Sequence, residues 1–273
     1  MSITFDVNSA RLDGCSDGKG PKFIWLHALT SSRARERQRG IYDWTRLTDE
    51  LTVIRFDARG HGKSSGEPDE RHYVWKQLAI DLSDVLATYS QEHVAVGGAS
   101  MGAATALWAA LESPTNMRAL VLATPPAAWG DRTLQAQGWR KAAHIIEKYG
   151  LADLHRRLAG SEAKAPPFFE GHPELLDTAY DVAEALLPAV LRGAAASDLP
   201  ERESLASITV PTLVLAWPND PDHPVKTAQA VADALPNSQL RIAADVSSAR
   251  EWPHIVRKFL IQEMGVYDSE LQG

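Results

Sequence analysis

The feature that most constrains this chain is segment 94–108, where an apolar, β-branched run is followed by Gly-x-Ser-x-Gly and then by an alanine-rich run. The first run predicts a buried strand and the last a helix, so the turn between them must be tight. Gly98 and Gly102 leave room for it, with Ser100 at the apex and its hydroxyl exposed. The N–H of Met101 opens the predicted helix and can face a developing negative charge. The segment therefore predicts a nucleophilic serine.

Length, charge and cysteine content exclude several other classes of protein. The chain has 273 residues, of which 44% are hydrophobic, and a formal charge of −7. Its length suits one large α/β domain or a domain with an insertion, and its charge disfavours nucleic acid or an anionic membrane as the main partner. The single cysteine, Cys15, rules out an internal disulfide. We expect a cytoplasmic protein, a monomer or homodimer, that acts on a small-molecule substrate.

Neither a membrane segment nor a metal site is predicted. No apolar run is long enough to span a bilayer, and residues 1–6 lack the basic and apolar regions of a signal peptide. No Cys/His cluster has zinc spacing, and no phosphate-binding glycine loop is present. These observations predict no metal.

Strand and helix patterns alternate through most of the chain, which predicts a mostly parallel, doubly wound sheet with helices on both faces. The predicted strands are 22–27, 52–57, 92–97, 118–123, 212–217 and 239–243. The predicted helices around them are 73–89, 103–111, 226–235 and a last helix from near Pro253. Between them, the helical patterns 133–149, 151–159 and 174–192 follow one another. We therefore predict an α/β core of residues 1–125 and 205–273 and a helical cap of residues 126–204.

Two turns after predicted strands carry further candidate residues. Segment 27–32 is a small-residue turn, where the N–H of Leu29 can complete an oxyanion hole with Met101. His27 in this turn is expected to brace the backbone, although it can also line a pocket. Segment 218–224 follows a strand and holds two carboxylates, of which Asp220 is preferred to Asp222 as a triad acid because it is nearer the strand end.

These segments together resemble the α/β-hydrolase family, in its subgroup with a helical cap. Residues 27–32 are similar to its H-G-x-x-x-S turn with Ala28 in place of glycine, and 57–64 to its D-x-R-G-x-G-x-S turn. Residues 98–102 and 220–224 resemble its nucleophile elbow and acid loop. The resemblance implies a cap inserted after the sixth strand and a reaction without cofactors. It implies an esterase, lactonase, thioesterase or C–C hydrolase, while lyases, cofactor-free oxygenases and receptors share the fold.

The chain lacks a histidine at the position where the family carries its catalytic one. The family places this residue between the last strand and last helix, but here segment 243–252 has none, and Asp245, Ser247 or Ser248 takes its place. Serine is a poor nucleophile without a base. His223, three residues after Asp220, is the preferred substitute. The alternatives are His254, His27 or His61, a cap histidine (His144, His155 or His172), or no histidine base at all.

Aromatic side chains on or near the predicted cap suggest an apolar pocket. Trp129, Trp139, Phe168 and Phe169 can line it together with Trp217, although packing explains each of them as well. The chain is predicted to be a serine hydrolase of a small carboxylic ester, lactone or thioester with an atypical triad. The alternatives are a ligand-binding protein that has lost its triad, and a cofactor-free lyase or oxygenase.

Overall fold

The computed structural model describes residues 1–114, 116–159, 166–176 and 180–266. Within them lies an eight-stranded sheet of order β1-β2-β4-β3-β5-β6-β7-β8. The strands are β1 (Ser2–Val7), β2 (Ala10–Gly18), β3 (Lys22–Leu26), β4 (Thr52–Phe56), β5 (Val94–Ala99), β6 (Met117–Ala123), β7 (Thr212–Ala216) and β8 (Ser238–Ile242). The β1–β2 and β2–β4 pairs are antiparallel. All the pairs that follow in this order, from β4–β3 to β7–β8, are parallel. The predicted mostly parallel sheet is confirmed, and β1 and β2 are added to it.

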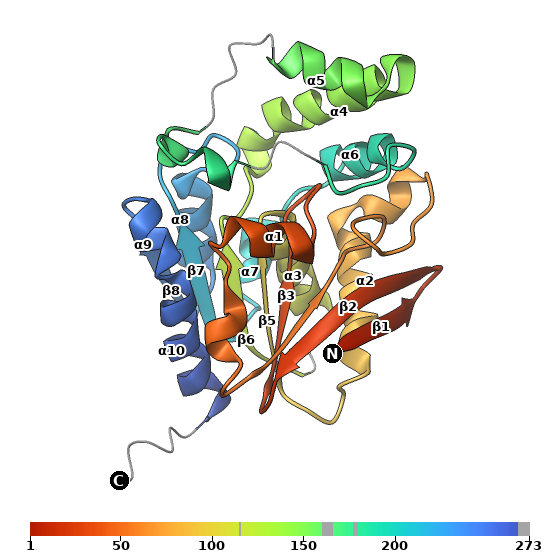
Figure 1. Ribbon diagram of the computed structural model, residues 1–273. Coiled ribbons are helices and arrows are strands. Elements are labelled where there is room, and N and C mark those ends of the chain that lie inside the picture. The colour runs from red at the N-terminus through yellow and green to blue at the C-terminus, as the bar shows by residue number, and fades with distance from the viewer. Residues whose placement is uncertain (115, 160–165, 177–179, 267–273) are drawn as a thin grey trace.

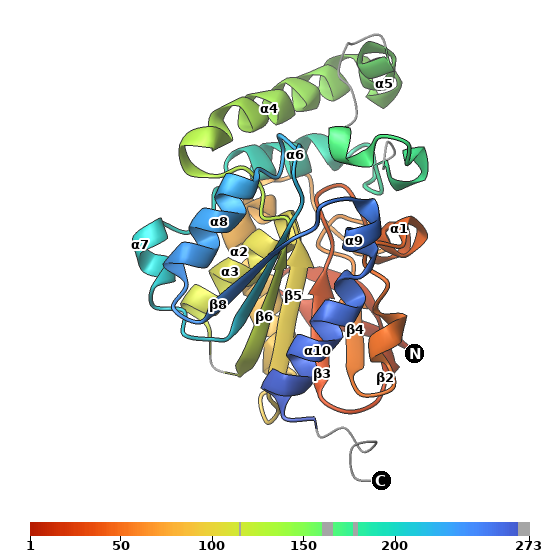
Figure 2. The same cartoon turned by 90° about the vertical axis from the view of Figure 1, so that its left-hand side faces the viewer.

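Helices cover both faces of the sheet because its central strands are apolar on both sides. Every residue of β5 is buried, which is typical of a parallel strand between two helical layers. On one face pack α2 (Trp75–Ala87), α3 (Met101–Glu112) and α8 (Val225–Ala234). On the other face packs α10 (Trp252–Met264), as Figure 2 shows. The predicted helices of the core are all present, with ends that differ by one or two residues.

A group of helices lies beyond the carboxyl ends of the strands (Figure 1). It includes α4 (Arg132–Tyr149), α5 (Leu151–Ala159) and α6 (Leu187–Ala195), with the short turns η4 (Pro167–Phe169) and η5 (Pro173–Leu175) between α5 and α6. The division into a core and a cap of residues 126–204 stays a prediction. None of the helices described in the structure combines the length and apolar character needed to cross a membrane.

The predicted helix 174–192 is wrong over its first part, and residues 177–179 of it lie outside the described residues. The chain around Asp181 and Val182 is extended and bonded to the core turns instead. The N–H of Asp181 donates to the carbonyl of Thr30 (2.8 Å), and Val182 forms an antiparallel bridge with His61. These tertiary contacts override the helical pattern, and α6 starts only at Leu187, with a proline in its first turn.

Candidate active site

The turn between β5 and α3 holds Ser100 in a strained backbone conformation. Its φ of 53° and ψ of −110° lie in a region that non-glycine residues rarely adopt. A Cβ on Gly98 would come closer than 3.0 Å to the backbone of Gly102, and one on Gly102 closer than 3.0 Å to Leu26. Only glycine fits at both positions, so the two glycines allow the sharp turn that presents the Ser100 side chain.

The loop after β7 brings a carboxylate and an imidazole to this serine. Nε2 of His223 lies 2.9 Å from Oγ of Ser100, and Nδ1 of His223 lies 2.8 Å from Oδ2 of Asp220. Asp220 is 6% exposed and also accepts hydrogen bonds from the indole Nε1 of Trp217 (2.8 Å) and from the N–H of Asp222 (3.0 Å). The three side chains form a continuous hydrogen-bonded chain.

The charges of Asp220 and His223 shift one another's pKa. Burial alone would raise the pKa of Asp220, but the neighbouring His223 and the bonds from His223, Trp217 and Asp222 lower it to about 2. Burial alone would lower the pKa of His223, but the Asp220 carboxylate and its hydrogen bond raise it above its ordinary value. The carboxylate therefore stays ionised at neutral pH and favours a protonated imidazole, as a general base requires after it takes a proton.

Two backbone N–H groups that follow the carboxyl ends of the neighbouring strands β3 and β5 have no acceptor among the described residues. They belong to Met101, at the start of α3, and to Leu29, in the turn after β3. In the turn after β3, the N–H groups that follow Leu29 are bonded. The N–H of Thr30 donates to Nε2 of His61 (3.3 Å), and the N–H of Ser31 donates to the carbonyl of Ala28 (3.2 Å). The arrangement leaves both predicted oxyanion donors available.

The other candidate histidines are engaged elsewhere or exposed. Nε2 of His27 accepts from the N–H of Ala58 (2.8 Å), and Nδ1 lies 2.8 Å from the carbonyl of Ala28. His61 links Thr30 to the carbonyl of Arg59. Burial lowers the pKa of His27 to about 4 and that of His61 to about 3, so both are neutral braces at pH 7. The side chains of His144, His155 and His254 are exposed.

Within the described part of the chain, segment 243–252 brings no side chain into a hydrogen bond with Ser100, whose hydroxyl is bonded to His223 instead. Residues Val246–Arg250 form the short helix α9, and Oδ1 of Asp245 caps it by accepting from the N–H and the hydroxyl of Ser248, both at 2.7 Å. Trp252 then stacks on Trp217 at 5.2 Å between ring centroids. Asp245 and Ser248 thus form a helix cap, and Trp252 packs against Trp217 at the start of the acid loop.

The predicted pocket-lining aromatics do not come together in one pocket. Trp217 stacks on Phe168 at 5.1 Å and belongs with Trp252 to the buried core cluster on the α10 face. The rings of Trp129 and Trp139 pack against the cluster on the opposite face. The Trp139 ring faces the guanidinium of Arg132 at 4.4 Å, and the indole of Trp129 donates to the carbonyl of Pro200 (3.1 Å).

His27 is likewise separate from these aromatics. It borders a small cavity of about 20 Å³ together with Leu26, Met101 and Arg59, a space for about one water molecule. Of the predicted pocket residues, Trp217 has a hydrogen bond to the chain of Ser100, His223 and Asp220: its indole N–H donates to Asp220, a bond that the sequence does not predict.

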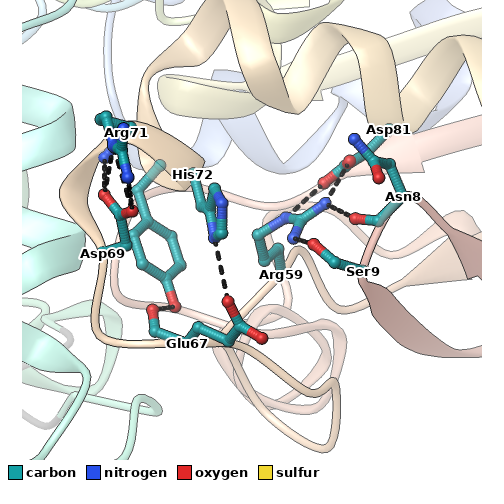
Figure 3. Close-up of polar contacts among 9 residues, drawn as sticks. Asn8, Ser9, Arg59, Glu67, Asp69, Arg71, His72 and Asp81 are labelled. Carbon is teal, nitrogen blue, oxygen red and sulfur yellow. Dashed lines mark hydrogen bonds and ion pairs between the residues drawn. The ribbon is translucent and has the colours of Figure 1, made fainter.

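A buried ion pair anchors the glycine-containing turn after β4. The guanidinium of Arg59 makes two hydrogen bonds to the carboxylate of Asp81 on α2 (2.9 and 2.7 Å), and it also donates to the carbonyl of Asn8 and the hydroxyl of Ser9 (Figure 3). Figure 3 also shows the exposed pair of Asp69 and Arg71 nearby. Because this turn carries Ala58 and His61, the buried pair supports the histidine braces beneath the Leu29 turn.

Comparisons with known proteins agree with this fold. A sequence model of the family described as alpha/beta hydrolase fold matches residues 23–144. The chain is 26% identical over 235 residues to 3-oxoadipate enol-lactonase 2 of Acinetobacter baylyi, which covers 85% of this chain and 84% of that protein. It is 31% identical over 121 residues to 2-(acetamidomethylene)succinate hydrolase of Mesorhizobium japonicum, 44% of this chain and 41% of that protein. The solved enol-lactonase of Burkholderia xenovorans superposes with a TM-score of 0.75 at 20% identity, covering 96% and 100% of the two chains.

Proposed function

We propose that the chain, which has the α/β-hydrolase fold, is a serine hydrolase of small carboxylic esters, lactones or thioesters. Ser100 is the nucleophile, His223 the general base and Asp220 the acid that orients it. The triad is complete but atypical, because its base and its acid share one loop.

A single observation supports this proposal most strongly: Ser100, His223 and Asp220 are joined by hydrogen bonds of 2.9 and 2.8 Å. A serine hydroxyl gains nucleophilicity when a base can accept its proton at this distance. The depressed pKa of Asp220 keeps the carboxylate charged, which stabilises the imidazolium formed during attack.

The proposed reaction proceeds through an acyl-enzyme. His223 takes the hydroxyl proton while Oγ of Ser100 bonds to the substrate carbonyl carbon, and the carbonyl oxygen becomes an oxyanion held by the N–H groups of Met101 and Leu29. The imidazolium then gives its proton to the leaving alcohol or thiol as the C–O or C–S bond breaks. Water, activated by the same imidazole, hydrolyses the acyl-serine and restores the enzyme.

Hydrolysis is supported at the level of the family, because the matched relatives carry the names of an enol-lactonase and an amide-containing succinate hydrolase. Both names describe substrates with a carbonyl group next to a heteroatom. We therefore place a small carbonyl substrate under the predicted cap, and we prefer an ester or lactone to a larger molecule.

The alternative of a binding protein without a triad is disfavoured by the intact hydrogen-bonded chain at Ser100. The experiment that tests the proposal is hydrolysis of a panel of p-nitrophenyl esters, aliphatic lactones and acyl thioesters by the wild-type protein and by Ser100→Ala. We expect the wild-type protein to turn over at least one of these classes and Ser100→Ala to turn over none. Absence of turnover with all three classes would favour the binding-protein alternative.

A further inference from the structure

An acidic side chain beside the oxyanion turn has no part in the mechanism above. Glu36 lies in α1 (Arg33–Arg39), a helix whose sequence alternates arginine with other residues. A glutamate among arginines is normally solvated, but Glu36 is 4% exposed, and it is the one buried residue among those described in α1. Burial of a carboxyl group is costly unless it is hydrogen-bonded.

The carboxyl group of Glu36 has two hydrogen-bond donors, one of them in the turn itself. Its Oε1 accepts from the N–H of Ala28 (3.1 Å), and its Oε2 accepts from the indole Nε1 of Trp25 on β3 (2.7 Å). Ala28 directly precedes Leu29, whose N–H is the second donor of the proposed oxyanion hole. Glu36 therefore acts on the peptide next to the one that carries this donor.

Glu36 is one of several partners that hold this turn. The peptide that carries the Leu29 N–H is held at its other end, where the carbonyl of Ala28 accepts from the N–H of Ser31 (3.2 Å) and lies 2.8 Å from Nδ1 of His27. On the far side of Leu29, the N–H of Thr30 donates to His61, and the carbonyl of Thr30 accepts from Asp181 (2.8 Å). On the near side, among the described residues, the N–H of Ala28 has Glu36 as its acceptor. The turn is thus held on both sides of Leu29, whose own N–H has no acceptor among the described residues.

Burial raises the pKa of the Glu36 carboxyl to about 7, although the bonds from Trp25 and Ala28 and the nearby Arg39 and Arg55 oppose the shift. A carboxyl group that is partly neutral at physiological pH opposes a nearby oxyanion less than a full negative charge would. Glu36 can accordingly hold the turn with a reduced electrostatic cost to the reaction.

We propose that Glu36 is a positioning residue, which fixes the Leu29 N–H at the oxyanion through its hydrogen bond to Ala28. The inference rests on the proposed hydrolase function. Oxyanion donors act on the transition state more than on the bound substrate, so a displaced donor lowers kcat and leaves KM nearly unchanged. A role in packing alone would lower stability without this split.

The test compares steady-state hydrolysis of p-nitrophenyl acetate by the wild-type protein, Glu36→Met and Glu36→Asp. Met has a similar length and no carboxyl acceptor, and Asp keeps the acid but withdraws it by one methylene. Each change is expected to lower kcat by about 10-fold to 100-fold, the scale of a misplaced catalytic group, with KM within about twofold. Circular dichroism and thermal melting establish that each variant is folded, and Glu36→Asp carries the test alone if Glu36→Met does not fold.

Whether glutamine can replace Glu36 is measured in the Trp25→Phe variant. Trp25→Phe removes the other donor to Glu36, so it is expected to lower stability while kcat stays near the wild-type value. In that background, Glu36→Gln still offers an amide oxygen to Ala28 and has no second donor to satisfy, so kcat should remain within about threefold of Trp25→Phe, as a retained hydrogen bond requires. Glu36→Met in the same background should lose kcat as it does alone.

The outcomes separate this inference from the proposed function. Wild-type turnover that depends on Ser100, with folded Glu36→Asp and Glu36→Met at wild-type kcat, would overturn the positioning role alone. Equal losses of kcat in Trp25→Phe and Glu36→Met would assign Glu36 to packing, and would also overturn it. A wild-type protein without Ser100-dependent turnover would overturn the proposed function and this inference with it.

Discussion

Oγ of Ser100 lies 2.9 Å from Nε2 of His223, although the two residues are 123 positions apart in the sequence. The imidazole reaches the serine from the loop that also supplies its acid, and not from the segment between β8 and α10. His223 lies three positions after Asp220, so one loop between two prolines, Pro218 and Pro224, carries both partners of the nucleophile. Displacement of this loop would therefore move the base and the acid together.

The pH dependence of kcat/KM should report the protonation of His223. The imidazole accepts the Ser100 proton only when it is neutral, so activity rises with pH through its pKa. Because the Asp220 carboxylate raises this pKa, the midpoint of the rise should lie above 6.5. A midpoint below 6.5, measured with an ester whose own hydrolysis is subtracted, would contradict the assigned base.

Loss of the Asp220 carboxylate should lower kcat severely, whereas loss of the neighbouring Asp222 carboxylate should change kcat only slightly. Asp220→Asn is expected to lower kcat by about 10⁴-fold, because an amide does not hold the imidazole in the right tautomer. It should also move the rise of kcat/KM to lower pH, since burial then lowers the pKa of His223 without an opposing carboxylate.

Asp222→Asn is the matched control in the same loop. Its N–H still donates to Asp220, and its side chain contacts Gln135 at the surface. We expect kcat within about threefold of the wild-type value, as for an exposed polar contact. Steady-state kinetics of the two variants decide between the carboxylates, and the reverse order of effects would assign the acid role to Asp222.

Loss of the buried Arg59–Asp81 pair should lower the free energy of unfolding more than loss of an exposed pair nearby. Asp81→Ala leaves the Arg59 guanidinium buried without its carboxylate, which is expected to cost about 3–5 kcal/mol in the free energy of unfolding. Asp69→Ala breaks a nearby but exposed pair with Arg71, and its unfolding curve should stay near that of the wild type. Urea unfolding monitored by tryptophan fluorescence measures both, and equal effects would show that burial does not set the difference.

The sequence predicted the fold well where periodicity was long and unbroken. The alternation from 22 to 123 and from 212 to 264 indicated the parallel sheet and its helices, because buried strands and amphipathic helices have distinct spacing. It failed at 174–192, where the extended chain around Asp181 and Val182 is bonded to Thr30 and His61. No local pattern encodes such pairing between distant segments.

For the site, the Gly-x-Ser-x-Gly turn and the position of Asp220 after a strand could be read from spacing alone. The choice of His223 among the histidines depends on the path of the loop after Asn219, whose φ is 60°, and a sequence does not display that path. Glu36 was missed because a glutamate between arginines has the pattern of an exposed helix. The sequence predicts Trp217 only as a pocket-lining residue, because its bond to Asp220 requires a specific ring orientation that a sequence does not display.

The proposed triad is tested most directly by the rate at which a fluorophosphonate probe labels Ser100 in the wild-type protein, His223→Ala and His254→Ala. The probe reacts with a serine activated by its base, and Ser100→Ala gives the background. We expect rapid labelling of the wild-type protein and of His254→Ala, and a loss of at least about 10³-fold in His223→Ala, the scale of a missing triad base. Labelling of folded His223→Ala at the wild-type rate would contradict the triad of Ser100, His223 and Asp220.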